Sequence, residues 1–598
     1  MPVVDVTKAF RFALDLAEGQ EGLLERHAGS ARWAFNHAHA QLLAQQQAFD
    51  LRKSRAAEEL SGLDCDSFLA LPKSDRRELY ARAGRQVREE NVRRCAELRL
   101  WDEHRRLVKH WGRPRLDAGP VPPGDAPRAA QVLYRRRREL AALETSDPVR
   151  YRVERKAELD EIRPRVIEAK QRLAGEGAYI LDAFDLKSLW RQRRHLPREE
   201  GGSPWYEGMH TEAFGCGIER ASTAWANWMS SVAGKRKGPK MGMPRFKKKG
   251  RARESFTLPN PSRKAVGFTS YRRLDVRSLG NFRLHTPARH LLRLIRKDRA
   301  QITSVTFGRE GHRWYASVLC VVQQDIPHRP TRTQRVNELI AVDLGSDPVA
   351  VLSAPLDIAR PDSDRIPALK PYRLGQKQLA RIQRKLSRCA KGSKRRRKKL
   401  QPRLARAHHL VAERRKGFLH GVSKQLTTRA AVIAIEDLDL KALTASAAGD
   451  VAAPGRNVTV KSVFNRHLLD NGLGELRRQL VYKSSWYGSR LLVLEKGTAT
   501  ATECSKCGER NPSSKPGKKR FTCPACGLDV DRRTNSVRNI YKVARGQYTS
   551  VASGQGETQN ALREEEPPTA SDGAGPSSLK RPPPAPAGRA GGRPTRSP

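Results

Sequence analysis

Two pairs of cysteines near the C-terminal end constrain the fold of this chain more than any other feature of its sequence. The first pair, CSKC, begins at Cys504, and the second, CPAC, begins at Cys523, with 15 residues between them. Two CxxC turns at this distance can close a tetrahedral site of four thiolates, which zinc usually occupies. Because such a site is closed, it is structural. The sequence therefore predicts one structural Zn²⁺ ion bound by Cys504, Cys507, Cys523 and Cys526.

The remaining cysteines give no sign of a disulfide framework. The chain has nine cysteines, and the five outside the two pairs lie far apart in the sequence. Disulfide-rich secreted domains are small and densely cross-linked, so this usage indicates a reducing compartment, and we expect a cytoplasmic protein. The sequence shows no long apolar run, signal-peptide pattern or basic amphipathic anchor, so binding to a membrane is not expected.

The chain carries a very large excess of positive charge. Lys and Arg number 115 against 63 Asp and Glu, which gives a formal net charge of +52 over 598 residues. A compact protein with this charge repels itself unless a polyanion neutralises it. Nucleic acid is the expected partner, because contacts to its phosphates release counterions. The length also indicates several domains.

The N-terminal region is predicted to be mostly helical. The alternating segment FRFALDL predicts a strand at residues 10–16, and apolar residues at helical spacing follow it. From about residue 51 to 175 the sequence is rich in Arg and Glu, which predicts long helices interrupted by a loop at 117–127. This region is either a solvated helical hairpin or a surface that grips nucleic acid, and the residues alone leave both interpretations open.

A strongly basic loop precedes a group of predicted strands. The loop GKRKGPKMGMPRFKKKGRAR combines cations, which bind phosphate, with Gly and Pro, which let the backbone approach a phosphate chain closely. The alternative is a disordered, solvated loop. Alternating segments between residues 282 and 322 predict a small antiparallel barrel or sandwich. The candidate nucleic-acid ligands in the loop are Lys235, Arg236, Lys237, Arg245, Lys247, Lys248, Lys249 and Arg251.

The C-terminal half alternates between apolar strands and helices, which is typical of an α/β domain. Its longest helix is basic, and so is the segment between the two cysteine pairs. After about Gly546 the chain becomes rich in Gly, Pro, Ser and Arg, which predicts a disordered tail. Further candidate nucleic-acid ligands in this half are Lys394, Arg395, Arg396, Arg397, Lys398, Lys399, Lys518, Lys519 and Arg520.

Two acidic residues end buried strands in this half. Asp343 lies in IAVDLG and Glu436 in IAIEDL. A carboxylate at the end of an apolar strand can face a cleft, and two or three such acids can hold two Mg²⁺ ions for phosphodiester hydrolysis. Either motif alone is weak, but both occur here in a basic chain with a predicted zinc ribbon. They are the candidate catalytic residues.

Several of these segments follow one another in an order that resembles a known family. They resemble the transposon-encoded RNA-guided nucleases and the type V CRISPR effectors descended from them. The resemblance covers about residues 180–544 and roughly the first 40 residues. It leaves out the insert at about 51–175, and a recognition lobe enlarged in this way points to a CRISPR effector. The matching segments are IAVDLGSDPVAVLS, KGSKRRRKKL, FLHGVSKQL, VIAIEDLDLKAL, LRRQLVYKSSWYGSRLLVLE, the cysteine pairs, TNSVRNI and, upstream, GMPRFKKKGRARESFTL.

The resemblance implies a bilobed, multidomain α+β protein. It would have a helical recognition lobe, an OB-like β-barrel wedge domain, and an RNase H-like (RuvC) α/β domain with an inserted zinc ribbon that binds the target nucleic acid. The expected ranges are 1–16 for the first wedge strand, 17–244 for the recognition lobe, 245–332 for the wedge barrel, 333–498 for RuvC with its basic bridging helix, 499–530 for the zinc ribbon, 531–545 for the last RuvC segment and 546–598 for a disordered tail.

The third acid of the implied RuvC site is replaced in this chain. The first two acids of the family map to Asp343 and Glu436, and the third stands two residues before an Asn that corresponds to Asn535, which places it at Arg533. Two carboxylates and one guanidinium sum to roughly −1, where three carboxylates give roughly −3. We therefore expect at most one weakly bound Mg²⁺ ion.

Asp531 offers an alternative third acid. In a helix it would point about 200° around from Arg533, away from the site, but in an extended segment it would share the face of Arg533. The sequence leaves this register open. The residues of the degenerate RuvC site are thus Asp343, Glu436, Arg533 and Asp531.

With a damaged RuvC site and an intact zinc ribbon, the chain is most similar to subtype V-M. The resemblance implies a cytoplasmic, monomeric ribonucleoprotein of a prokaryote that uses a guide CRISPR RNA in antiviral defence. It would bind double-stranded DNA beside a T-rich PAM, form an R-loop and silence by occupancy, with weak or absent DNA cleavage. A residual activity would process guide-RNA precursors. The alternatives are an active RuvC endonuclease that uses Asp531 and an unguided zinc-ribbon DNA-binding protein.

Overall fold

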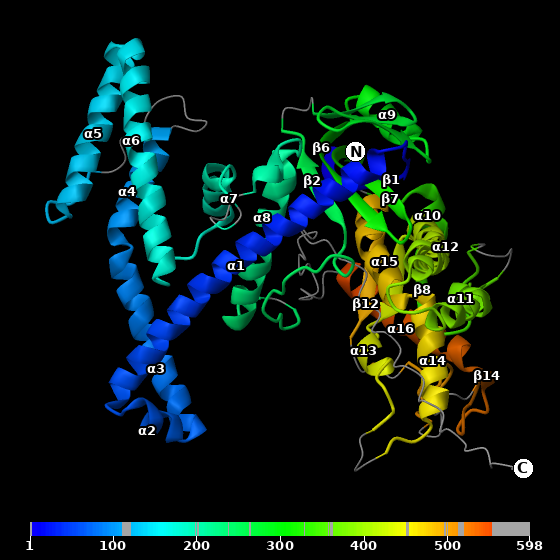
Figure 1. Cartoon of the computed structure of the whole chain (residues 1–598). Coiled ribbons are helices and arrows are strands. Elements are labelled where there is room, and N and C mark those ends of the chain that lie inside the picture. The colour runs from blue at the N-terminus through cyan, green and yellow to red at the C-terminus, as the bar shows by residue number, and fades with distance from the viewer. Residues whose placement is uncertain are drawn as a thin grey trace, which may run out of the picture. The chain divides into compact units, whose positions relative to one another are not determined.

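The structure, a computed structural model, describes most of the chain (Figure 1). It covers residues 3–552 apart from 110–120, 198, 200–202, 237, 262–264, 328, 357, 359–362, 450–453, 496–497, 499 and 512–518. Contacts divide the chain into two units, Lys8–Val321 and a second that runs from Val322 and includes the first seven residues. None of the described helices is long and apolar enough to cross a membrane.

Helices dominate the first unit, as the sequence predicts. Helix α1 packs against α3 and α8, and α4, α5 and α6 pack on one another. Gly217 allows the close approach of α8 to α1, because a Cβ there would lie 2.2 Å from the carbonyl oxygen of Ala31. The helices are α1 (Gln20–Ser61), α2 (Cys65–Ala70), α3 (Lys73–Arg94), α4 (Ala96–Lys109), α5 (Arg128–Ser146), α6 (Pro148–Gly175), α7 (Ala183–Arg193), the short η2 (Pro204–Tyr206) and α8 (Thr211–Val232).

A seven-stranded sheet follows, but it is not the predicted barrel. Its strands run in the order β2-β6-β7-β1-β5-β4-β3. A closed barrel needs hydrogen bonds between the edge strands β2 and β3, and none is found in the described part of the chain. The elements are β1 (Val3–Asp15), β2 (Ser255–Pro259), β3 (Val266–Ser270), β4 (Arg273–Val276), β5 (Gly280–Leu284), α9 (Arg289–Arg296), β6 (Ala300–Glu310) and β7 (Arg313–Asp325).

The second unit is built on a five-stranded mixed sheet, as the α/β pattern predicts. The order is β10-β9-β8-β11-β12. Strands β8, β11 and β12 are parallel, β9 is antiparallel to β8, and β10 is antiparallel to β9. Its elements are α10 (Arg332–Val336), β8 (Leu339–Leu344), β9 (Ala350–Leu352), β10 (Arg365–Ile366), α11 (Pro371–Ser387), the π-helical η3 (Arg396–Leu400), α12 (Gln401–Arg429), β11 (Val432–Glu436), α13 (Leu440–Leu443), α14 (Val458–Asn471), α15 (Leu473–Tyr487), β12 (Arg490–Leu494), β13 (Arg520–Thr522), β14 (Asp529–Asp531) and α16 (Arg532–Ala552).

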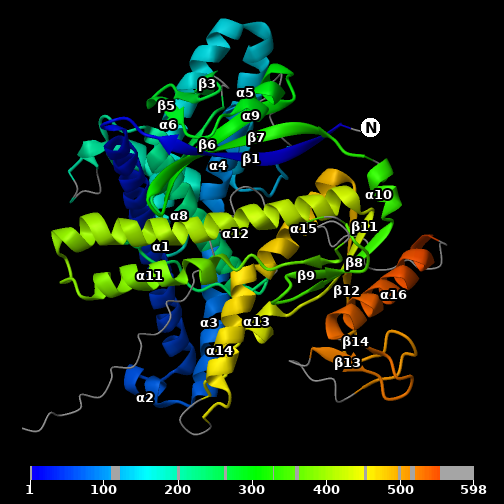
Figure 2. The ribbon, with the colours of Figure 1, turned by 90° about the vertical axis from the view of Figure 1, so that its right-hand side faces the viewer.

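Side chains of the parallel strands alternate between two covered faces of this sheet. Ile340 and Val342 face a core that includes residues of α12, α14 and α15. Leu339 and Ala341 face a second core with residues of α16. Figure 2 shows α16 beside β8 and β12, with β13 and β14 near its start. Because the period is two, Asp343 must share the face of Leu339 and Ala341, on which α16 packs.

Helix α16 continues beyond the point where the sequence analysis expects disorder. It runs to Ala552, whereas the tail is predicted to begin at Gly546. The helix continues because Tyr541, Val543, Ala544 and Tyr548 keep an apolar face on the core of the sheet. Residues 553–598 lie outside the described residues.

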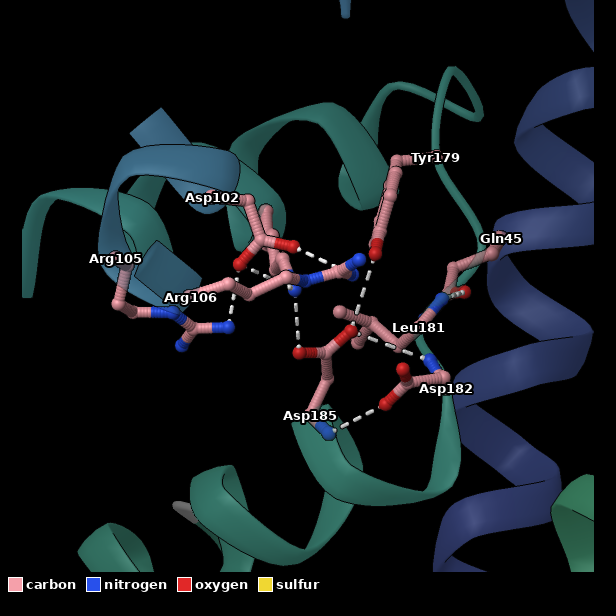
Figure 3. Close-up of polar contacts among 9 residues, drawn as sticks. Gln45, Asp102, Arg105, Arg106, Tyr179, Leu181, Asp182 and Asp185 are labelled. Atoms are coloured by element: carbon pink, nitrogen blue, oxygen red, sulfur yellow. Dashed lines mark hydrogen bonds and ion pairs between the residues drawn. The ribbon is translucent and has the colours of Figure 1, made fainter. Parts of the chain in front are cut away.

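Buried charges join α4, α6 and α7 in the first unit. Lys170 of α6 is 4% exposed, and its ammonium lies 2.8 Å from an oxygen of Asp185 and 3.8 Å from Asp102. Figure 3 shows Asp102, Asp185 and Tyr179 converging, with the Tyr179 hydroxyl donating to Asp185. Burial, followed by the charge of Asp185, raises the pKa of Tyr179. A buried carboxylate needs such partners to remain ionised.

We predict that Lys170→Met destabilises the helical region. The substitution leaves Asp185 buried without its counter-ion, which should lower the free energy of unfolding by about 3 kcal/mol. The midpoint of thermal unfolding measures it. Arg106→Gln is the matched control, because Arg106 also pairs with Asp102 but its side chain is 76% exposed, so its loss should stay under about 0.5 kcal/mol. Equal midpoints for the two variants would show that the buried ammonium is dispensable.

Candidate functional site

The two predicted acids lie side by side at the ends of neighbouring parallel strands. Strands β8 and β11 pair in parallel up to Val342 opposite Ile435, so the next residues are Asp343 and Glu436. Adjacent strands lie about 4.8 Å apart. Asp343 is 8% exposed, and Glu436 is half-buried. The strand register therefore brings both carboxylates to one edge of the sheet, beneath the first turn of α16.

Arg533 occupies this edge, and each nitrogen of its guanidinium donates one hydrogen bond. Its Nε donates to Oδ2 of Asp343 over 2.5 Å, and one terminal nitrogen donates to the carbonyl oxygen of Asp343 over 2.6 Å. The other terminal nitrogen donates to the carbonyl oxygen of Pro348. The guanidinium thus binds both the side chain and the backbone at the end of β8.

Gly345 leaves the space that this guanidinium fills. A Cβ at residue 345 would lie 2.8 Å from Cζ of Arg533 and 2.9 Å and 3.0 Å from its terminal nitrogens. Real Cβ atoms do not come this close, so any side chain at residue 345 would push the guanidinium away. The loop after β8 and Arg533 fit each other.

Asp531 binds the start of α16 through one carboxylate oxygen. It is the last residue of β14, and its Oδ1 accepts hydrogen bonds from the backbone N–H groups of Arg533 (3.0 Å) and Thr534 (3.2 Å). This is the geometry of a helix N-cap, here for α16. Arg365 lies 3.4 Å from the same oxygen. Asp531, the alternative third acid of the sequence analysis, therefore holds the first turn of α16.

Burial sets the electrostatics of the two acids. Burial raises the pKa of Asp343, and the charge and hydrogen bond of Arg533 act against it. Burial also raises the pKa of Glu436, which accepts a hydrogen bond from the hydroxyl of Thr500. Arg532 adds a second cation near both acids, and its buried Nε has no partner among the described residues.

These residues do not fit a site for two Mg²⁺ ions. Asp343 gives an oxygen to Arg533, Glu436 gives one to Thr500, and Asp531 caps α16. Among the described residues of this second unit, the only group of three or more His, Cys, Asp or Glu residues whose ligand atoms all lie within 4.8 Å of one another is the four cysteines. A divalent ion at the sheet edge would have to displace Arg533.

The four predicted zinc ligands come together as the sequence indicates. Sγ of Cys504 lies 3.6 Å from that of Cys526, and Sγ of Cys507 lies 3.5 Å from that of Cys523. A tetrahedral zinc with Zn–S bonds of about 2.3 Å separates its sulfurs by roughly 3.8 Å. A glycine with positive φ follows each cysteine pair, Gly508 (81°) after the first and Gly527 (67°) after the second. This backbone conformation tightens the turn. The donor set and its spacing fit zinc.

Two asparagines on α16, which the sequence analysis did not single out as functional, hold the ribbon in place. The side chain of Asn535 bonds the backbone N–H of Ser505 (2.8 Å) and the carbonyl of Glu503 (2.7 Å). Asn539 donates to the carbonyls of Thr500 and Glu503, each over 2.8 Å. Their spacing of four residues in TNSVRN, which places both amides on one helix face, was the available signal. Helix α16 therefore joins the sheet edge that carries the acids to the predicted zinc ribbon.

Some predicted nucleic-acid ligands have partners within the protein. Lys247 lies with its ammonium 3.5 Å from the ring centre of Phe35, and burial lowers its pKa to about 8. Arg396 donates to the carbonyls of Leu386 and Cys389, and Arg520 pairs with Asp529 over 2.6 Å. These three cations support the fold.

The other predicted cations have fewer constraints. Arg236 is half-buried, with a 3.0 Å bond to the side-chain oxygen of Asn227. Lys237 and Lys518 lie outside the described residues, as does the side chain of Arg397. The exposed members are Lys235, Arg245, Lys248, Lys249, Arg251, Lys394, Arg395, Lys398, Lys399 and Lys519.

Removal of one thiol should remove the metal. We predict about one zinc per wild-type chain, a much lower zinc content in Cys523→Ala, and a lower midpoint of thermal unfolding, because a structural zinc site contributes directly to folding. Atomic absorption of the purified chain measures the metal. Cys389→Ala, outside the cluster, should keep the full content. Full zinc in Cys523→Ala would contradict the four-thiolate site.

Three family models match parts of this chain. The model described as "Probable transposase" matches residues 318–447, and the "Cas12f1-like, TNB domain" matches 474–540. A third, "Helix-turn-helix domain", matches residues 1–48, where the structure has β1 and the start of the single helix α1.

Individual proteins match over longer stretches. "Putative RNA-guided DNA endonuclease Rv2885c" of Mycobacterium tuberculosis (strain ATCC 25618 / H37Rv) is 30% identical over 339 residues, which is 57% of this chain and 69% of that protein. "Putative RNA-guided DNA endonuclease InsQ" of Escherichia coli (strain K12) is 31% identical over 301 residues, which is 50% of this chain and 67% of that protein. Among solved structures, the "Cryo-EM structure of the Cas12f1-sgRNA-target DNA complex" shows 11% identity and a TM-score of 0.37, with 90% of this chain and 99% of that chain covered.

Proposed function

From the premise that the chain belongs to the family of RNA-guided DNA endonucleases, we propose that it is a TnpB-like protein of the type V lineage. The chain would bind a guide CRISPR RNA and use it to bind double-stranded DNA beside a T-rich PAM. It would form an R-loop and silence the DNA by occupancy, with cleavage weak or absent. We place it in the cytoplasm of a prokaryote as a monomeric ribonucleoprotein for antiviral defence, most similar to subtype V-M.

The position of Arg533 is the observation that supports weak or absent DNA cleavage. Cleavage by two metal ions needs carboxylate oxygens that are free to bind them. Here the guanidinium is held by Asp343, by its backbone carbonyl and by that of Pro348. Opposite charges 4 Å apart attract by about 4 kcal/mol at an effective dielectric constant of 20. An incoming ion must overcome this attraction, and it meets a site of charge roughly −1 instead of roughly −3.

Guide-directed recognition is expected because RNA-guided complexes recognise DNA in two ways. Base pairing to the guide reads the sequence, while the protein reads a short flanking motif and the backbone. The charge of +52 suits a guide RNA and a DNA duplex held together. The exposed lysines and arginines of the 235–251 loop and of residues 394–399 are the phosphate ligands we propose, and the zinc ribbon would contact the target.

Two rival functions remain distinct in what they require. An active endonuclease would need Asp531 as the third acid, but Asp531 caps α16 and pairs with Arg365. An unguided zinc-ribbon DNA-binding protein would purify without small RNA. Processing of guide-RNA precursors stays a prediction.

Binding and cleavage should be measured in the same tubes. The protein is reconstituted with guide RNA, Mg²⁺ and a matched duplex that carries a randomised flank. We expect guide-dependent binding in a gel shift, enrichment of a T-rich flank and intact strands, because Arg533 occupies the metal site. Strand breaks at a rate typical of a nuclease would contradict the occupancy function, and equal binding without a guide would contradict guidance.

A gain of activity tests the role of Arg533 directly. Arg533→Asp should produce Mg²⁺-dependent nicking at least tenfold above the wild type, because it restores the third acid. Arg532→Asp has the same change of charge one residue away and should not produce it. Adding Asp343→Ala to Arg533→Asp should abolish the nicking. If Arg532→Asp nicks and Arg533→Asp does not, the assigned register is wrong.

A further inference from the structure

A basic groove lies at the other end of the strand that carries Asp343. Its volume is about 650 Å³, and it is lined by residues 336–340, which lead from α10 into β8, and by one side of α16. Leu339 and Asp343 are four residues apart on this strand, a separation of about 13 Å. The groove is therefore separate from the acids and the guanidinium at the strand's far end.

One face of α16 supplies cations and aromatic rings to this groove. Arg538, Lys542 and Arg545 recur at intervals of four and three residues, which places them on one helix face. They span about 10 Å along the axis, roughly three nucleotide steps of one strand at 3.4 Å per step. Arg538 is exposed and has no partner among the described residues, and the groove has one acid, Glu338.

Two tyrosines lie between these cations. Tyr541 and Tyr548 pack by one side on the core under α16 and also line the groove. The hydroxyl of Tyr541 accepts a hydrogen bond from Arg545 over 3.0 Å, which orients ring and guanidinium together. Rings fixed in this way, next to cations, are the combination that binds bases by stacking and phosphates by charge. A purely structural role explains the buried sides of the rings and the contacts of Lys542 and Arg545 within the protein, but it does not explain Arg538.

The zinc ribbon contributes a wall of the same groove. Lys542 donates to the carbonyl of Ser505, the residue after the zinc ligand Cys504, and Ser505 itself lines the groove. The groove is thus held by two rigid parts, α16 and the first cysteine turn. We propose that this groove binds a short single-stranded stretch of nucleic acid, with phosphates on Arg538 and Arg545 and a base on Tyr541 or Tyr548. The role in a guided complex rests on the proposed function, but the binding itself does not.

Site-specific cross-linking tests the groove in the full chain. The photoreactive residue p-benzoylphenylalanine is placed at Tyr548 or, as a control, at Phe464, which is 39% exposed on α14. The probes are labelled single-stranded 12-nucleotide RNA and DNA and a 12-base-pair duplex. We expect cross-links at position 548 with either single strand, at least threefold above position 464 and above the duplex. Cross-linking at 548 no stronger than at 464 overturns the proposal.

Matched variants separate the groove from the general charge of the protein. Arg538→Gln with Arg545→Gln should lower the cross-linked fraction at least threefold. It should also reduce the slope of log affinity against log salt by about 1.4, at about 0.7 per phosphate of a single strand. Arg466→Gln with Lys441→Gln removes two exposed cations elsewhere on this unit and should change neither. Unchanged zinc content verifies folding, and equal losses from both pairs overturn the proposal.

The assembled complex identifies the source of the strand. The guide RNA and the target DNA carry different labels. The label that is cross-linked to position 548 shows which strand occupies the groove. If no guided complex forms but single strands still cross-link at 548, the proposed function fails and the groove stands. If a guided complex forms and position 548 cross-links to neither strand, the groove proposal fails and the function stands.

Discussion

The ion pair between Asp343 and Arg533 determines how the second unit is arranged. A carboxylate at the end of a buried strand needs a partner, and here the partner is Arg533. Asp531 fixes the backbone of Arg533 by capping α16, and Gly345 leaves space for its guanidinium. Because Arg533 lies in the first turn of α16, the same contact places that helix along β8. Asn535 and Asn539 then hold the predicted zinc ribbon, and the rest of the helix forms one wall of the basic groove.

Much of this site could be predicted from the sequence because its parts lie in strongly patterned segments. Strands IAVDLG and IAIEDL are almost wholly apolar, so their terminal acids stand out, and parallel pairing brings strand ends together. The spacing of the cysteine pairs was enough to predict the four-thiolate cluster. The position of Arg533 came from family resemblance alone, since nothing in its local sequence indicates that it contacts a residue 190 positions earlier.

The features that the sequence did not predict depend on long-range contacts. Whether a seven-stranded sheet closes is decided by pairing between strands far apart in the chain, so the sequence could not exclude a barrel. Lys247 and Arg396 belong to basic runs that favour phosphate binding, yet an aromatic ring and two carbonyls are their partners. The role of Asp531 depended on where strand β14 ends and the helix begins, a boundary that periodicity leaves uncertain by a few residues.

The guanidinium of Arg533 gives this sheet edge a permanent counter-ion. Three clustered carboxylates repel one another when no divalent ion is bound, so a domain built on them is strained whenever the ion is scarce. Here the compensating charge is covalently part of the chain and is never diluted, chelated or exchanged. The integrity of the second unit should therefore be the same in a magnesium-starved cell as in a replete one.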